Sequence, residues 1–331
     1  MSCRPLAVAV LLAIVAPAGA APQAGATAPG QGNHCAPDNS CFPVEALPDA
    51  DREAAADLFQ RILDSEGLYT VVGGTKPASS GFVRFSVEVE QASAAEVERC
   101  RRLLESFRCA GAVFATVHHF AKTYENPKTG RRERPYEGIV FAVEPLRQLV
   151  RNHAPFFSRL GVTEHSHPVE ILMAVEYATD GDRWRGYGWL YGFPSAAVDF
   201  FVDAGLRQQQ TGEFVRRRFV SLPTFARQER GVVYAVAEDA PETEADRTFR
   251  RLIEATLAEY RRRRAQYVGP GKPGVVRLLR NWYCGAGTCR LPAVAEGPVS
   301  GEGGKTAAQA TSGFSNRQGS PSRRQAASAA R

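Results

Sequence analysis

The stretch Gly186-Tyr-Gly-Trp-Leu-Tyr-Gly-Phe-Pro-Ser-Ala-Ala-Val-Asp-Phe-Phe-Val-Asp203 has a pattern in two parts. In the first part, glycine or leucine separates aromatic residues that recur at every second position: Tyr187, Trp189, Tyr191 and Phe193. Alternate residues of a strand point to opposite faces, so this spacing predicts a strand with one aromatic face and one nearly bare face, against which another part of the chain packs. In the second part, Pro194 suits the first turn of a helix, and apolar residues follow at helical spacing. We therefore expect an extended segment that leads directly into a buried helix.

The alternating rings have two interpretations. Buried rings would belong to the core, whereas exposed rings would form a platform on which a saccharide or an aromatic ligand binds. The sequence favours burial, because the helix that follows supplies more apolar surface at Val198, Phe201 and Val202. If the rings are exposed, the candidate ligand-binding residues are Tyr187, Trp189 and Tyr191.

Segments with helical periodicity and segments with strand periodicity lie on both sides of this stretch, but helices and strands do not alternate regularly along the chain. We expect helices over residues 49–65, 94–107, 145–152, 168–178 and 242–267, and strands over residues 68–72, 82–90, 112–124, 138–144, 219–222 and 231–238. The turn Glu125-Asn-Pro-Lys-Thr-Gly130 joins two of these strands and predicts an antiparallel hairpin. The expected fold class is α+β, a single globular domain with a mainly antiparallel sheet flanked by helices. Two domains that meet near Asp180 are the alternative.

Residues 1–20 have the three parts of a secretory signal peptide. Arg4 gives a positive start, Leu6–Val15 is an apolar run, and Ala18-Gly-Ala20 suits a signal peptidase. The run is too short to cross a membrane, which takes about 20 apolar residues. We expect cleavage near Ala20, a mature protein with no transmembrane segment, and a secreted or periplasmic location.

The composition of the rest of the chain changes at two points and predicts three segments. Residues 21–34 are rich in alanine, proline, glycine and glutamine and predict a flexible leader. Residues 35–291 form the expected globular domain, and residues 292–331, with few large apolar side chains, predict a disordered low-complexity tail. The formal net charge is only +6, from 41 basic and 35 acidic groups. Nucleic-acid binding is therefore disfavoured, and only weak association with anionic envelope components is expected.

The cysteines fit an exported protein. Six of them remain after signal cleavage, an even number that suits an oxidising compartment: Cys35, Cys41, Cys100, Cys109, Cys284 and Cys289. The simplest pairing joins Cys35 to Cys41 and Cys284 to Cys289 across short turns. One helix through Cys100 and Cys109 would hold them about 13 Å apart, so either the helix ends first or each pairs elsewhere. We expect no free thiol.

Two histidines could bind a metal. His165 and His167, if extended, could join Glu170 in the nitrogen and carboxylate set that zinc uses. The favoured interpretation is that His167 caps the helix beginning at Pro168 and that His165 lies at the surface or packs. The neighbours His118 and His119 lie on opposite faces of their expected strand and cannot share one metal.

The sequence lacks a phosphate-binding P-loop and a Gly-x-Ser-x-Gly nucleophile motif. The main hypothesis is therefore an exported soluble protein of unknown activity, a binding or structural protein without a cofactor and with unknown partners. Two alternatives are a metal-dependent hydrolase that uses His165, His167 and a nearby carboxylate, and an envelope-associated protein held by basic surface charge.

Overall fold

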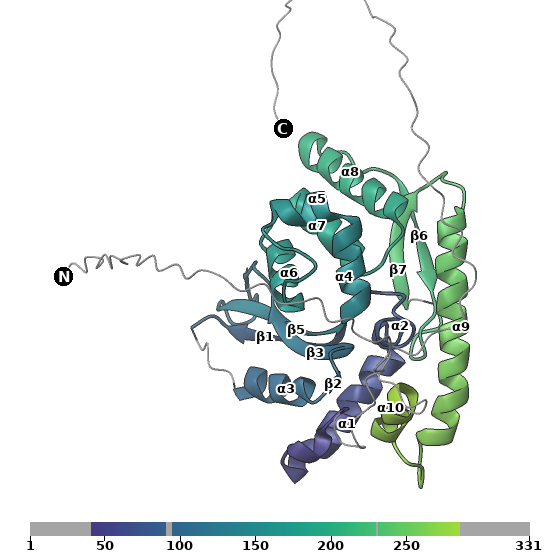
Figure 1. Cartoon of the computed structure of the whole chain (residues 1–331). Helices are drawn as coiled ribbons and strands as arrows, with labels where there is room; N and C mark the ends of the chain where they lie inside the picture. The colour runs from purple at the N-terminus through teal and green to yellow at the C-terminus, as the bar shows by residue number, and fades with distance from the viewer. Residues whose placement is uncertain (1–40, 91–94, 230, 285–331) are drawn as a thin grey trace, which may run out of the picture. The chain divides into compact units, whose positions relative to one another are not determined.

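A five-stranded antiparallel sheet lies at the centre of the part of the chain that the structure describes (Figure 1). The computed structural model describes residues 41–90, 95–229 and 231–284. The strand order is β1-β5-β3-β2, and β4 also pairs with β5. The strands are β1 (Ala78–Glu88), β2 (Arg108–Cys109), β3 (Val113–His119), β4 (Tyr124–Glu125) and β5 (Arg132–Ala142). The antiparallel register of β3 on β5, from Val113 opposite Ala142 onward, confirms the expected hairpin.

Helices cover both faces of this sheet and form a separate apolar cluster on each. Val113, Ala115 and Val117 pack in the first cluster, whose helices are α1 (Asp49–Asp64), α2 (Gly67–Val71), α3 (Ala95–Glu105), α9 (Glu244–Tyr267) and α10 (Val275–Cys284). Ile139 and Phe141 pack in the second, whose helices are α4 (Val143–Asn152), α5 (Ala154–Arg159), α6 (Pro168–Glu176), α7 (Asp180–Leu190) and α8 (Ser195–Thr211). This arrangement confirms the α+β class with an antiparallel sheet flanked by helices.

A second, two-stranded sheet joins the two groups of helices. Its strands are β6 (Arg217–Leu222) and β7 (Val232–Ala237), close to the expected bounds. Figure 1 shows these strands between α8 and α9, and β7 packs directly against α8. Tyr234 of β7 contacts Phe193, which precedes α8, with ring centroids 5.6 Å apart. The aromatic stretch is thus connected to both sheets.

Amphipathic periodicity located the long helices correctly. The expected apolar side of α1 is buried in full: Ala55, Leu58, Phe59, Ile62 and Leu63. The strand expected over residues 68–72 is wrong, because this segment forms the short helix α2, in which every residue is buried. Thr70 bonds Ser79 through a hydroxyl–hydroxyl contact of 2.8 Å, and Tyr69 donates to the Pro223 carbonyl. Such tertiary contacts override the β-propensity of the segment.

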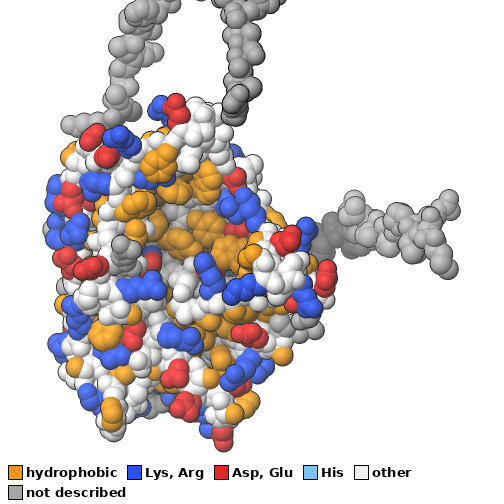
Figure 2. Space-filling view, turned by 180° about the vertical axis from the view of Figure 1, so that it is seen from behind, with side chains coloured by type: hydrophobic (Ala, Val, Ile, Leu, Met, Phe, Trp, Pro, Cys, Tyr) orange, Lys and Arg blue, Asp and Glu red, His pale blue; other side chains and the backbone are white. Residues whose placement is uncertain are grey.

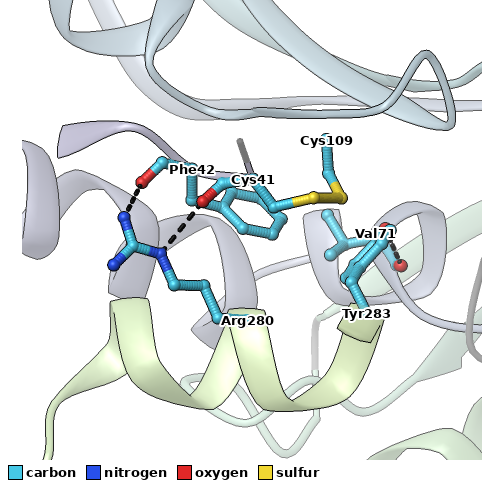
Figure 3. The surroundings of a disulfide bond; sticks show 6 residues. All are labelled: Cys41, Phe42, Val71, Cys109, Arg280 and Tyr283. Carbon is cyan, nitrogen blue, oxygen red and sulfur yellow. Dashed lines mark hydrogen bonds between the residues drawn. A yellow bond between two sulfur atoms is a disulfide. The ribbon is translucent and has the colours of Figure 1, made fainter. Parts of the chain in front are cut away.

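A disulfide joins Cys41 to Cys109 and fixes the start of the described chain against the sheet (Figure 3). The backbone N–H of Phe42 donates to the Arg108 carbonyl over 2.8 Å beside this bond. Arg280 of α10 donates to the carbonyls of Cys41 and Phe42 over 3.0 and 2.8 Å. The disulfide therefore lies in the first apolar cluster. The hydrogen bonds from Arg280 hold the backbone beside it.

The expected pairing of Cys41 with Cys35 is wrong, because Cys41 pairs across 68 positions of sequence instead. The expectation of no free thiol is also wrong. Cys100 is buried in α3 with a free thiol, because α3 ends at Glu105 and the chain turns back into β2 before Cys109. The other three cysteines, Cys35, Cys289 and the side chain of Cys284, lie outside the described residues.

The signal peptide, the leader, the first residue of the helix expected over residues 94–107 and the low-complexity tail also lie outside the described residues. Among the helices that the structure describes, none is long and apolar enough to cross a membrane.

Removal of the Cys41–Cys109 bond should lower the free energy of unfolding by about 4 kcal/mol, because the bond closes a long loop in the unfolded chain. We expect this loss in urea denaturation of the double variant Cys41→Ala, Cys109→Ala. The matched control is Cys100→Ala, which removes a buried thiol but no cross-link and should cost less than about 1.5 kcal/mol. Equal losses in the two variants would contradict the assignment.

Candidate ligand-binding cleft

The segment Asp180–Leu190 is the helix α7, so the strand expected over residues 186–193 is wrong. Two glycines let α7 approach both of its neighbours closely. A Cβ atom on Gly186 would lie 2.6 Å from Val175 Cγ1 of α6, and one on Gly188 would lie 2.7 Å from Val198 Cγ2 of α8. Positions two apart on a helix point about 200° apart. The glycines therefore face different neighbours, and α7 is wedged between α6 and α8.

The strand pattern predicted that Tyr187, Trp189 and Tyr191 share one face, but in a helix they point to two different sides. Tyr187 and Tyr191 are four apart, lie on the same side of α7 with Trp184, and line a cleft. Trp189 points away from them, is buried, and stacks on His153 with ring centroids 3.8 Å apart. Trp189 therefore belongs to the core, whereas the two tyrosines belong to the cleft wall.

The cleft has two adjoining ends, which lie between α7, the strands β1 and β5, and the β6–β7 sheet. The polar end has a volume of about 500 Å³ and is lined by the charged and polar residues Glu66, Ser80, Arg84, Glu137, Glu176 and Arg183. The apolar end has a volume of about 300 Å³ and is lined by residues that include Ala197, Val198, Phe201, Phe219 and Ala235. Both ends share Trp184, Tyr187, Tyr191, Phe193 and Val233. Figure 2 shows a hollow lined mostly by hydrophobic side chains with Lys and Arg side chains along one edge, which agrees with this composition.

Two charged residues and a histidine form a row across the strands beside the polar end. Glu137 of β5 lies opposite His118 of β3 and opposite Arg84 of β1. Its Oε2 atom accepts from Arg84 Nη2 over 2.9 Å, and its Oε1 atom lies 3.4 Å from His118 Nε2. Burial by itself raises the pKa of Glu137, but its polar neighbours, His118 first and then Ser80 and Arg84, hold this pKa below its usual range. The buried carboxylate is therefore an anion held by two nitrogen-bearing side chains.

His118 is buried, and both of its ring nitrogens face oxygen atoms. Nδ1 lies 3.3 Å from the carbonyl oxygen of His119, while Nε2 makes no hydrogen bond of normal geometry despite its proximity to Glu137. The next residue, His119, points to the other side of β3, where its Nε2 bonds the Tyr177 hydroxyl over 3.0 Å. Burial lowers the pKa of His119. As predicted, the two neighbouring histidines do not converge.

Glu176, at the end of α6, organises the wall next to this row. Its Oε2 atom accepts from the Tyr187 hydroxyl over 2.7 Å, and its Oε1 atom accepts from the backbone N–H of Ala121 over 2.8 Å. Arg183 adds a longer bond of 3.4 Å. Burial is the main reason that the pKa of Tyr187 is raised, so this hydroxyl stays protonated and donates. These bonds link α6 and α7 to the loop after β3.

A buried lysine lies beneath the aromatic residues shared by the two ends. The Nζ atom of Lys76 lies 5.4 Å from the ring centroids of both Tyr191 and Phe193 and forms an ion pair with Glu66. Ser80 and the Tyr191 hydroxyl bond each other over 2.9 Å. The pKa of Tyr191 is raised, mainly by burial. The ring of Tyr191 thus contacts the Lys76 ammonium group at its face and the Ser80 hydroxyl at its own hydroxyl group.

The structure does not bring the predicted metal ligands together as a site. His167 caps α6, because its Nδ1 accepts from the Val169 N–H over 3.3 Å and its own N–H donates to Glu170 over 3.0 Å. His165 is exposed, 3.7 Å from a carboxylate oxygen of Glu164. Within the described ranges, no group of three or more His, Cys, Asp or Glu residues is placed to hold a metal ion. The capping interpretation of His167 is correct.

The basic run at the end of α9 is engaged within the molecule. Arg264 forms a double hydrogen bond with Asp64 of α1, at 2.9 and 3.1 Å. Arg262 and Arg263 bond Glu259, and these bonds, first that of Arg262, lower the pKa of that carboxyl to about 2 although burial raises it. Each of these three arginines therefore has an acidic partner within the molecule.

No local pattern in the sequence marks the charged residues of the cleft. Arg84, Glu137 and Glu176 are far apart in the chain, and only the pairing of β1 with β5 and the packing of α6 bring them together. One signal was present for the aromatic wall. Trp184, Tyr187 and Tyr191 have helical spacing, which the alternation of glycines and rings obscured.

Comparison with known proteins identifies no relative. A scan against models of protein families, a search of curated proteins and a search of solved structures each give no match.

The close packing of α7 predicts that Gly186→Ala is destabilising. Alanine favours a helix by about 1 kcal/mol, but the methyl group would clash with Val175 and cost about 1–3 kcal/mol. Gly181→Ala in the same helix is the control, because its Cβ atom would lie 3.4 Å from Leu206, an ordinary contact. We expect urea denaturation to show a loss for Gly186→Ala and none for Gly181→Ala. A more stable Gly186→Ala variant would show that α7 is not wedged in this way.

Proposed function

We propose that the chain is an exported binding protein whose cleft holds a small molecule with an apolar body. The observation that carries the proposal is that a polar hollow and an apolar hollow adjoin each other and share one aromatic wall. Ligand sites are typically concave, mostly apolar and about 300–1,000 Å³ in volume, with a few polar groups that orient the ligand. The two ends, at about 500 and 300 Å³, fall in this range.

The exposure of the apolar end supports binding. Phe201, Phe219 and Val233 are large apolar residues that line this end and are 41, 65 and 39% exposed. Contiguous exposed apolar surface costs free energy in water and commonly marks a site that a partner covers. A flat or elongated apolar group that enters here would bury these side chains and the ring of Trp184.

The rigidity of the wall supports the same proposal. Tyr187 and Tyr191 are fixed at their hydroxyls by Glu176 and Ser80, over 2.7 and 2.9 Å. Aromatic side chains held in this way lose little conformational entropy when a ligand binds. The wall is therefore arranged for binding before a ligand arrives.

Export is the second part of the proposal. The signal-peptide pattern of residues 1–20 supports it, and the Cys41–Cys109 disulfide is typical of an oxidising compartment such as the periplasm or the extracellular space.

The neutral fluorescent probe N-phenyl-1-naphthylamine tests the binding proposal. We expect a saturable fluorescence increase with the wild-type protein. Val233→Glu should lower the affinity for the probe at least about tenfold, because the variant places a charge in the apolar end. Val89→Glu is the matched control, since Val89 is similarly exposed, at 37%, and does not line the cleft. Absence of saturable binding, or equal affinity of both variants, would refute the proposal.

A further inference from the structure

We infer that the ligand of this cleft is an amphipathic anion, whose acidic group binds Arg84 while its apolar body lies along the aromatic wall. The inference rests on the proposed binding function and adds the chemical class of the ligand. A carboxylate, a sulfonate or a phosphate monoester on an aromatic or acyl body has this chemistry.

The charges at the polar end differ sharply in their access to solvent. The side chain of Arg84 is 66% exposed, whereas that of Glu137, to which it is bonded, is 2% exposed. The Glu176 side chain is fully buried behind Arg183. An approaching ligand therefore meets a guanidinium group before it meets either of these two carboxylates.

The two buried carboxylates already have their partners. Glu137 uses one oxygen for Arg84 and places the other near His118, and Glu176 uses both oxygens within the wall. A buried carboxylate without partners would attract a cation, but Glu137 is paired with Arg84, and both oxygens of Glu176 accept hydrogen bonds. The cleft thus gives a cationic ligand little unpaired negative charge at this point.

Arg84 keeps part of its hydrogen-bonding capacity for a ligand. Its Nε and Nη2 atoms both donate to a single oxygen of Glu137, over 3.3 and 2.9 Å, and neither bond uses the N–H groups of Nη1. Arg84 also lines the polar end of the cleft. The guanidinium plane also lies over the ring of Phe120, 5.7 Å from its centroid. These contacts fix the fork, and a fixed guanidinium binds planar or tetrahedral oxyanions through paired N–H donors.

The different residues that line the two ends of the cleft indicate an amphipathic ligand. Arg84 and Arg183 line only the polar end, while Phe201, Phe219 and Ala235 line only the apolar end, and the shared aromatic wall connects them. A molecule that satisfies both ends must carry its charge at one end and its apolar surface at the other. The buried charges behind Arg84 hold the guanidinium in place and are positioning residues.

Two probes with nearly the same aromatic body separate this inference from the proposed function. 8-Anilinonaphthalene-1-sulfonate carries an anionic group, and N-phenyl-1-naphthylamine does not. For Arg84→Gln we expect the affinity for the sulfonate to fall about tenfold or more and the affinity for the neutral probe to change less than about twofold. The control Arg131→Gln removes a cation that pairs with Glu88 at the far end of the same sheet, and it should change neither affinity.

Arg84→Lys keeps the charge without the fork and should bind the sulfonate with intermediate affinity. Equal affinity of Arg84→Gln and the natural chain for the sulfonate would overturn the inference while leaving the proposed function intact. Parallel loss of both probes in Arg84→Gln would also overturn it, because Arg84 would then support the cleft and not the anion. If the natural chain bound neither probe, the proposed function itself would fail.

Discussion

The packing of α7 between α6 and α8 determines the rest of the candidate site. Gly186 and Gly188 remove the side chains that would keep the three helices apart, and the neighbouring valines occupy the space. Because the helix can take only one rotation in this position, it directs Tyr187 into the cleft and Trp189 into the core. A rotation of α7 by about half a turn would exchange these cleft and core residues. The close contacts at the glycines prevent it and so specify the binding surface as well as the fold.

The buried charges form the second constraint. A carboxylate inside a protein is costly unless it is bonded. Glu137 meets its partners only when β1, β5 and β3 pair in the observed register. Glu176 likewise meets Tyr187 only when α6 and α7 lie side by side. The same bonds that give the wall its rigidity therefore penalise other registers of the sheet and other positions of α7.

Sequence periodicity predicted the elements that repeat one simple pattern. The stripe of α1, the long helix α9 and the β3–β5 hairpin follow from spacing alone, and they are observed. The aromatic stretch was misread because a ring at every second position matches a strand, whereas the glycines between the rings serve helix packing on two sides. The Cys41–Cys109 bond and the Arg84–Glu137 pair depend on residues 68 and 53 positions apart, which no local pattern reveals.

Hydrogen–deuterium exchange with and without saturating 8-anilinonaphthalene-1-sulfonate tests the central claim, that the cleft beside α7 is the binding site. We expect slower exchange in peptides that cover α7 and β7, since both line the cleft, and unchanged exchange in α3, which does not line it. Protection confined to other parts of the chain, or no protection at saturation, would contradict the account.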